Sequence, residues 1–493
     1  MIKNFKWLLL VSLTFVACTN NDNSAPVTIP VSPGSATFTN YVALGDSFAA
    51  GYSDGALFEK GQQGSYTNIL SQQFALAGGG AFKIPYTSDN IGGLLLGGNV
   101  IAGTRLYFNG SGPVPVSGTP TTEVTNHLVG PFNNLGIPGA KSYHLIAPGY
   151  GNVAGVATGA ANPYFARFAT SSSTTVLADA LVQNPTFFSL WIGGNDVLGY
   201  ATSGGVGINQ TGNLNPATYG ANDITDPTVF ASVFSTLVNN LTAKGAKGVV
   251  ANLPYVTGLP YFTTVPYNPI PLDAPTIALL MNTTSGYGKY NGGIQYALSV
   301  GLISATEAVK RTISFHPGKD NAVVIEDSYL SDLTGYGIPS YRQATSEDLM
   351  VLPAMSFIGT TVGGNPLYVN GVSVPLADKW VLSKDEIAEV KVATDAYNVT
   401  IKAVADSKGL AFVDAKSLMD QLSSSSGIVS NNFTLTSTYV TGGSFSLDGV
   451  HPSPRGYALI ANAFSTAINT TYKSTFPMVD LGLYAILYPQ TIQ

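Results

Sequence analysis

The feature that most constrains the fold is an alternation of short apolar runs with amphipathic helical patterns along the chain. An apolar run of five to seven residues, bounded by glycine, proline or aspartate, is typical of a strand buried in a parallel sheet. The runs lie at 41–46, 132–137, 186–192, 248–253 and 410–414. Because helical patterns separate them, each strand can cross over to a parallel neighbour. The sequence therefore predicts an α/β protein with a mostly parallel five-stranded sheet.

Helices are expected from about residue 65, over 175–182, over 229–241, over 383–409 and around 457–464. The helix over 383–409 has the clearest boundaries, because Ser383 and Glu386 form a capping-box pattern and Gly409 follows its last periodic residue. Two stretches rich in glycine, proline and aromatic residues, about 78–130 and 256–380, interrupt the alternation and are predicted to be large loop insertions. Both leave the sheet near the carboxyl ends of strands, so we expect them to form walls or a lid around a ligand; the alternative is that they pack away from the site as additions to the scaffold.

Composition narrows the range of partners. Lys and Arg number 22 against 28 Asp and Glu, which gives a formal net charge of −6, and no stretch concentrates basic residues. Nucleic acid is therefore not an expected partner. A hydrophobic content of 45% excludes intrinsic disorder. No nucleotide-binding glycine loop is present, and the one cysteine cannot form a Cys-based metal cluster, so no cofactor or metal is expected.

The amino end has the pattern of an export signal. Lys3 and Lys6 precede an apolar run, residues 7–17, which predicts a signal peptide over residues 1–17. The run ends directly before Cys18 in a segment that resembles a bacterial lipobox, so Cys18 is the expected lipid-attachment residue. Thr19 favours the outer membrane of a Gram-negative cell envelope. Residues 18–38 are predicted to be a lipid-anchored tether, because they are rich in Asn, Pro, Ser and Thr without periodicity.

Two motifs supply the parts of a nucleophilic site. Ser47 follows the first predicted strand within Gly45-Asp46-Ser47, at the edge where parallel sheets bind their ligands. His451 has an aspartate three residues earlier, Asp448, which can reach its Nδ1 and leave Nε2 for a substrate. Each motif alone also fits an ordinary turn. The remaining histidines, at positions 127, 144 and 316, have no such partner and are predicted to be structural or surface residues.

Two further strand ends could bind a developing negative charge. Asn195 follows the third predicted strand within Gly193-Gly194-Asn195-Asp196, and its amide is a suitable hydrogen-bond donor. After the second strand, a backbone N–H could come from Gly139 or from Gly136. Each of these two motifs, considered alone, is also typical of an ordinary loop.

The order and spacing of these four motifs resemble those of the GDSL or SGNH hydrolases. The matching segments run from about residue 41 to 465 and leave the insertions unexplained. The resemblance implies a three-layer α/β/α, flavodoxin-like fold in a hydrolase domain over 39–475, followed by a C-terminal tail over 476–493. It also implies that Ser47 is the nucleophile, His451 the base and Asp448 its orienting partner. Gly139, preferred to Gly136 by the family motif, Asn195 and the N–H of Ser47 are the implied oxyanion hole.

The function implied by this resemblance is that of a secreted, lipid-anchored serine esterase or lipase that needs no cofactor. Its substrate would be a small-molecule or lipid ester, and its contact with the membrane would be the N-terminal anchor. A carbohydrate O-acetylesterase acting on acetylated glycans uses the same residues and remains an alternative. A non-catalytic surface-binding lipoprotein is a second alternative, suggested by the tyrosine-rich, weakly charged composition.

Overall fold

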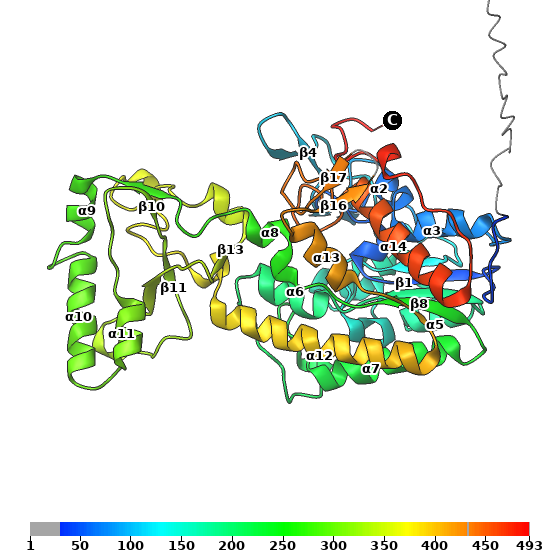
Figure 1. Cartoon of the computed structure of the whole chain (residues 1–493), viewed down its shortest axis with the longest axis horizontal. Coiled ribbons are helices and arrows are strands. Elements are labelled where there is room, and N and C mark those ends of the chain that lie inside the picture. Colours follow the sequence, from blue (N-terminus) through cyan, green and yellow to red (C-terminus); the bar gives the residue numbers. More distant parts are fainter. Residues whose placement is uncertain (1–29, 431–432, 493) are drawn as a thin grey trace, which may run out of the picture. The chain divides into compact units, whose positions relative to one another are not determined.

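The computed structural model describes residues 30–430 and 433–492. The predicted signal peptide over 1–17 and Cys18 lie outside the described residues. Five parallel strands form the central sheet (Figure 1). They are β6 (Asn134–Gly136), β1 (Tyr41–Gly45), β7 (Phe187–Trp191), β8 (Lys247–Ala251) and β15 (Ala411–Val413), in that spatial order. Numbered along the chain this order is 2-1-3-4-5, that of flavodoxin-like sheets.

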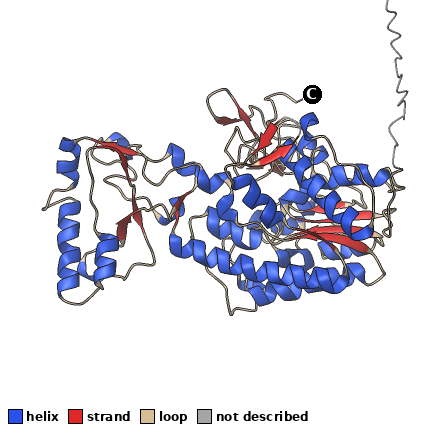
Figure 2. Cartoon of the chain, in the orientation of Figure 1, coloured by secondary structure: helices blue, strands red, loops and turns tan. Residues whose placement is uncertain are grey.

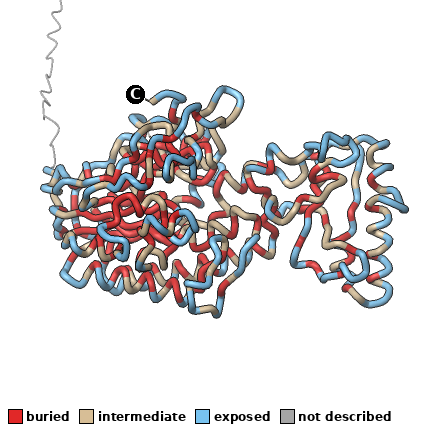
Figure 3. Tube along the Cα trace, turned by 180° about the vertical axis from the view of Figure 1, so that it is seen from behind, coloured by how far each residue is buried: buried red, intermediate tan, exposed pale blue. Residues whose placement is uncertain are grey.

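Helices cover both faces of the sheet, so the fold is a three-layer α/β/α sandwich, as predicted (Figures 1 and 2). One face carries α3 (Tyr66–Ala75) and α14 (Pro454–Tyr472), which pack against each other. The opposite face carries α5 (Val176–Leu181), α7 (Pro227–Thr242) and α12 (Lys384–Lys408). All five predicted helices are present. The sheet strands between the two layers are almost entirely buried (Figure 3).

Local signals explain where the main helices begin and end. Ser383 accepts a hydrogen bond from the N–H of Glu386, whose carboxylate accepts in return from the N–H of Ser383, so the predicted capping box starts α12. Gly409 ends α12 in the left-handed conformation that glycine adopts at low cost. Asp226 caps α7 in the same way as a serine would, by accepting from two backbone N–H groups of the first turn.

The first insertion consists of two hairpins. β2 (Leu94–Leu96) pairs with β3 (Asn99–Ala102), and β4 (Leu106–Phe108) pairs with β5 (Pro113–Pro115), both antiparallel. Glu123 holds the tip of the first hairpin, because its carboxylate accepts from the N–H groups of Gly97 and Gly98. The tip is thereby fixed in position.

The second insertion has its own small hydrophobic cluster, formed by Ile294, Ala297, Ile303, Ala308, Leu333 and Ile338. Its elements are α8 (Pro260–Thr263), β9 (Ile270–Leu272), α9 (Ala274–Leu280), α10 (Tyr287–Ser299), α11 (Ala305–Arg311), β10 (Gly318–Asn321), β11 (Val324–Glu326), β12 (Tyr341–Gln343) and β13 (Leu349–Met350). It closes where β13 pairs with β14 (Val381–Leu382), just before α12. Other residues of this insertion, such as Ile270, Ile325 and Met350, belong to the main core, so the insertion is part of the same folded unit.

The predicted tether is too long. Residues 31–38 belong to the folded unit that extends to the carboxyl end. Phe38 is 2% exposed, and its ring lies 4.3 Å from that of Phe74, 4.5 Å from that of Phe187 and 5.0 Å from that of Phe476. Composition alone suggested a linker, but the buried ring of Phe38 and the hydrogen bond from the N–H of Ser35 to the carbonyl oxygen of Tyr472 hold the segment. Any tether is therefore shorter than predicted and ends before residue 31.

The segment predicted as a C-terminal tail also packs on the fold. Phe476 and Tyr488 are buried. The guanidinium of Arg105, itself fully buried, donates from Nη2 to the carbonyl oxygens of Pro489 and Gln490 at 2.8 and 2.9 Å. Residues 476–490 are thus part of the folded unit.

The carboxyl half also contains α13 (Ala415–Ser423) and an antiparallel pair of strands, β16 (Ile428–Ser430) and β17 (Phe433–Leu435). Among the described residues, no helix combines the length and apolar character needed to cross a bilayer.

Candidate active site

Ser47 lies two residues past the carboxyl end of β1. It opens the short helix α1 (Ser47–Ala50), and Asp46 caps this helix by accepting from the N–H of Phe48 at 3.0 Å. Gly45 makes the turn possible, because a Cβ there would lie 2.5 Å from the carbonyl oxygen of Trp191 on the adjacent strand β7. The sequence therefore places a serine hydroxyl at the ligand-binding edge of the sheet, as predicted from the strand order of such folds.

A continuous hydrogen-bond chain joins Ser47 to His451 and Asp448. The Oγ of Ser47 lies 2.8 Å from Nε2 of His451, and Nδ1 of the same ring lies 2.9 Å from Oδ2 of Asp448. These distances allow the imidazole to receive the hydroxyl proton while the carboxylate holds Nδ1–H. The structure thus brings Ser47 next to His451, which lies 404 positions later in the chain, and to Asp448, three residues before His451.

Asp448 is held as an anion. Burial alone would raise its pKa, but the neighbouring His451 and backbone N–H donors, including that of Val450, lower the pKa of Asp448 to about 2. Its Oδ1 accepts from the N–H groups of His451 and Val450 at 2.8 and 2.9 Å, and its Oδ2 also accepts from the N–H of Gly55 at 2.9 Å. The carboxylate can therefore fix the orientation of the imidazole across the neutral pH range.

The histidine loop is attached to the segment that follows Ser47. Ser53 donates to the carbonyl oxygen of Pro452 at 3.0 Å, and Oδ1 of Asp54 accepts from the N–H of Leu447 at 2.9 Å. Burial raises the pKa of Asp54 to about 7, and its Oδ2 has no hydrogen-bond partner among the described residues. These contacts, together with the start of α14 at Pro454, hold His451 beside Ser47, just beyond the carboxyl end of β1.

The two backbone N–H groups predicted for the oxyanion hole have no partner in the described part of the structure. The N–H of Ser47 and that of Gly139 have no acceptor among the described residues. The N–H of Gly136 donates to Oδ1 of Asn134 at 2.9 Å, so Gly136 is not free for this role. The structure therefore separates the two glycines that the sequence left as alternatives. Gly139 is also exposed, with a φ of +79° that favours glycine.

Asn195 begins α6 (Asn195–Thr202), just beyond β7. Its Nδ2 donates one hydrogen to the carbonyl oxygen of Ala140 at 2.9 Å, which fixes the amide and leaves its second hydrogen available. The sequence motif gave no role to Asp196. Its carboxylate accepts from both the N–H and the hydroxyl of Ser142, at 2.8 and 2.7 Å, and so ties the end of β7 to the loop after β6.

A cavity of about 600 Å³ opens beside Gly139. Leu96 and Ile101 of the β2–β3 hairpin form one wall, and residues of the 139–163 segment form the rest. Aliphatic and small side chains predominate, and the polar side chains among the lining residues are those of His144, Tyr150 and Asn162. We call this cavity the Gly139 groove. His144, which sequence analysis had set aside, therefore lines the cavity next to the site, whereas His127 and His316 are exposed.

Aromatic side chains flank the histidine, and the sequence motifs gave no sign of them. The ring of Phe48 lies 5.5 Å from that of His451 and 5.2 Å from that of Trp191, and the ring of Tyr52 lies 4.6 Å from that of His451. These rings cover part of the imidazole, whose side chain is 13% exposed. The only sequence signal for Phe48 and Tyr52 was that they lie close to Ser47 along the chain.

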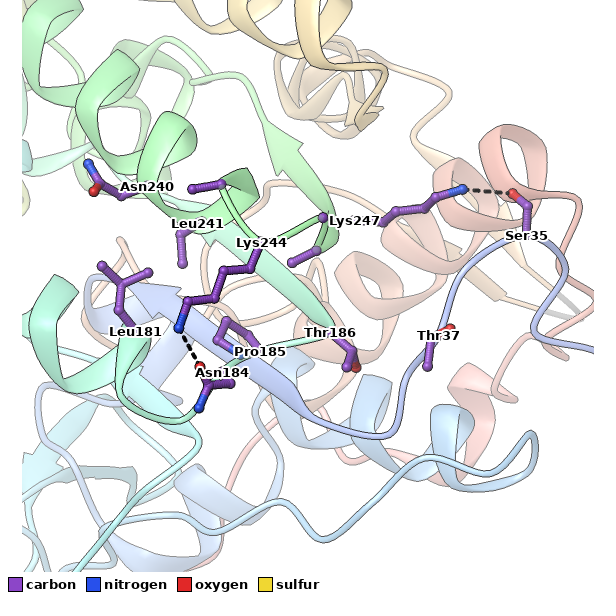
Figure 4. Close-up of a pocket in the computed structure, with 13 residues that line it drawn as sticks. Ser35, Thr37, Leu181, Asn184, Pro185, Thr186, Asn240, Leu241, Lys244 and Lys247 are labelled. Atoms are coloured by element: carbon purple, nitrogen blue, oxygen red, sulfur yellow. Dashed lines mark hydrogen bonds between the residues drawn. The ribbon is translucent and has the colours of Figure 1, made fainter.

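A second cavity, of about 560 Å³, lies at the amino ends of the sheet strands, opposite the ends that carry Ser47 (Figure 4). It borders Thr186, just before β7, and Lys247, the first residue of β8, so it is remote from Ser47. Lys244 donates to Asn184 and Lys247 to Ser35, and Figure 4 shows the two side chains extending in different directions. Because their charges do not converge, this cavity is not a built anion site.

In the described part of the chain, no group of three or more His, Cys, Asp or Glu side chains is arranged to hold a metal ion.

Comparisons with known proteins add little. No protein-family model matches the chain, and no curated protein matches it. One similar solved structure is an α/β hydrolase enzyme from the metagenome of Lake Arreo, Spain, at 11% identity, covering 88% of this chain and 96% of that one with a TM-score of 0.33. Another is an extracellular lipase from Streptomyces rimosus, at 12% identity, covering 88% and 99% with a TM-score of 0.31. Similarity at this level supports no functional conclusion.

Proposed function

We propose that the protein is a serine esterase of the SGNH type that hydrolyses carboxylic esters through an acyl-enzyme on Ser47. The observation that carries the proposal is the hydrogen-bond chain from Ser47 Oγ through His451 to Asp448, with spacings of 2.8 and 2.9 Å. A serine hydroxyl is a weak nucleophile unless a neighbouring base takes its proton. This arrangement supplies that base and fixes it.

In the first half of the reaction, Ser47 Oγ attacks the ester carbon while its proton passes to Nε2 of His451. The carbonyl oxygen becomes an oxyanion bound by the N–H groups of Ser47 and Gly139 and by the amide of Asn195. The bond to the alcohol oxygen then breaks, and His451 returns the proton to that oxygen. Water attacks the acyl-enzyme in the second half, again giving a proton to His451, which returns it to Ser47 as the acid leaves.

The Gly139 groove favours a neutral acyl chain over an acetyl group on a glycan. Its volume of about 600 Å³ is within the range of sites for drug-sized ligands, far more than two carbon atoms need. No Asp, Glu, Lys or Arg belongs to its lining residues. A glycan would be expected to meet more hydrogen-bonding groups than His144, Tyr150 and Asn162 provide.

The cellular location is proposed from the sequence alone. The lipobox-like segment before Cys18 favours an exported lipoprotein, most consistent with the outer membrane of a Gram-negative cell. Metabolic labelling with a fatty-acid analogue, compared between the native chain and Cys18→Ser, would test this. Equal labelling of both would contradict it.

Aryl esters from acetate to palmitate, with acetylated xylan, offered to protein lacking residues 1–18 would test the activity. We expect hydrolysis of aryl esters that Ser47→Ala abolishes. Acetylated xylan as the preferred substrate would favour the O-acetylesterase, and no hydrolysis of any ester would favour a binding lipoprotein.

A further inference from the structure

His144 stands out because its hydrogen-bonding state is fixed. Its Nδ1 accepts from the backbone N–H of Lys141 at 3.0 Å, so in the neutral ring the proton is on Nε2. Burial, together with the nearby charge of Lys141, lowers the pKa of His144 to about 4. The ring is therefore neutral at pH 7 and presents one N–H donor.

That donor has no partner within residues 30–430 and 433–492. Among the described residues no hydrogen bond to Nε2 of His144 is present, and the atom is not among the buried groups that lack one. His144 lines the Gly139 groove together with Gly139 itself. Nε2–H of His144 is thus accessible to a ligand in a groove that is otherwise largely apolar.

The ring cannot easily turn away. It stacks on Tyr150 with centroids 4.3 Å apart and an interplanar angle of 8°. The hydroxyl of Tyr150 accepts from Nδ2 of Asn162 at 3.1 Å, and the same amide donates to the carbonyl oxygen of Pro138 at 2.8 Å. His144 is therefore connected, through packed and hydrogen-bonded groups, to the residue that precedes Gly139.

The fold indicates which part of an ester enters this groove. His451 precedes α14, which packs with α3 on one face of the sheet. His144 lies in the 3₁₀ turn η1 (Ser142–Ile146), which packs against α5 and α7 on the other face. The alcohol oxygen must face Nε2 of His451 to receive its proton. The part of the ester that extends towards His144 is therefore the acyl chain.

We propose that the Gly139 groove binds the acyl chain and that His144 donates a hydrogen bond from Nε2 to an oxygen atom on that chain. The preferred substrates are then esters of neutral oxo- or hydroxy-acids rather than of plain fatty acids. This inference rests on the proposed esterase activity and adds its substrate class. A site that offers a donor discriminates against chains that leave the donor unpaired.

The test compares aryl hexanoate with its 4-oxo and 5-oxo counterparts, which differ in one carbonyl oxygen. For the native enzyme we expect kcat/KM to be at least about tenfold higher for one of the oxo-esters. His144→Asn can keep an acceptor for the N–H of Lys141, but its amide is too short to place an N–H at the Nε2 position, so the ratio of kcat/KM between oxo-ester and hexanoate should fall to about one. His144→Gln, which can place an amide N–H near the Nε2 position, should restore part of the preference.

His316→Asn is the matched control, because this exposed histidine lies in the second insertion and should leave both rates unchanged. A parallel series with the carbonyl on the alcohol chain should not respond to His144. The inference is overturned if the native enzyme prefers neither oxo-ester, if His144→Asn keeps the preference, or if only the alcohol series responds. Absence of hydrolysis of every ester would instead overturn the esterase proposal itself.

Discussion

Replacing Asp448 with asparagine keeps the shape of the side chain but removes its ability to orient His451 as a base. Asparagine keeps one oxygen, which is best placed at the Oδ1 position, where the N–H groups of His451 and Val450 both donate. The NH₂ group then takes the Oδ2 position and faces Nδ1 of His451. An imidazole that accepts there carries its proton on Nε2. It then cannot take the proton of Ser47.

The expected effect on activity is a fall in kcat of about 10⁴-fold, the size seen when this tautomer is lost in serine hydrolases. The expected effect on stability follows from the pKa of Asp448, about 2 in the folded protein against an ordinary 3.8. At about 1.4 kcal/mol per pH unit, that difference corresponds to about 2 to 3 kcal/mol. Because the folded-state pKa is lowered, this stabilisation is present above about pH 4 and is lost as the pH falls through 2.

The assay is hydrolysis of an aryl ester at pH 7 by Asp448→Asn, with urea unfolding of the same protein at pH 7. Asp406→Asn is the control, because Asp406 pairs with Lys402 on the surface of α12 and its side chain is 61% exposed. We expect the control to keep its activity and nearly all of its stability. A folded Asp448→Asn enzyme with kcat within tenfold of the native value would refute the assigned role of the carboxylate.

Three further changes test other parts of the site. Asn195→Ala should lower kcat by ~10²–10³-fold with a smaller change in KM, because one oxyanion donor is removed; an unchanged kcat with the chemical step limiting would exclude Asn195 from the hole. Ile101→Trp should fill the Gly139 groove. We then expect kcat/KM for octanoate esters to fall at least tenfold while acetate hydrolysis is retained. Equal losses for both esters would argue against an acyl groove. Asp54→Asn should raise the urea midpoint of unfolding at pH 8 but not at pH 3. The pKa of Asp54 is raised in the folded protein, so its charge destabilises the fold only as the pH rises above about 4. A lower urea midpoint at pH 8 would show that the charge is needed.

The sheet and its main helices could be predicted because each carries a local signal. The run before Ser47 and the capping box at Ser383 depend only on neighbouring residues, and both predictions are confirmed. The site residues could be proposed because their motifs follow strand ends, where the sheet brings distant parts of the chain together. The catalytic roles themselves stay predictions.

Other features depend on contacts that no local pattern contains. The family motif favours Gly139 over Gly136, but only the structure shows that the N–H of Gly136 is already used by Asn134 and that Gly139 is exposed. His144 was set aside for lack of a carboxylate nearby, whereas its state is fixed by a backbone N–H three residues earlier. Phe38 was assigned to a tether because its partners lie far along the chain.

The separation of Ser47 from His451 along the chain also affects when the protein can become active. A ribosome completes Ser47 early, but the base that would activate it is made only after residues 48–450, including both insertions. Arg105, from the first insertion, must then also receive the carbonyl groups of Pro489 and Gln490. Since domains fold as units from such distant pieces, a growing chain carries an unactivated hydroxyl. In the proposed mechanism, ester hydrolysis would therefore begin only after His451 has been made and lies against Ser47.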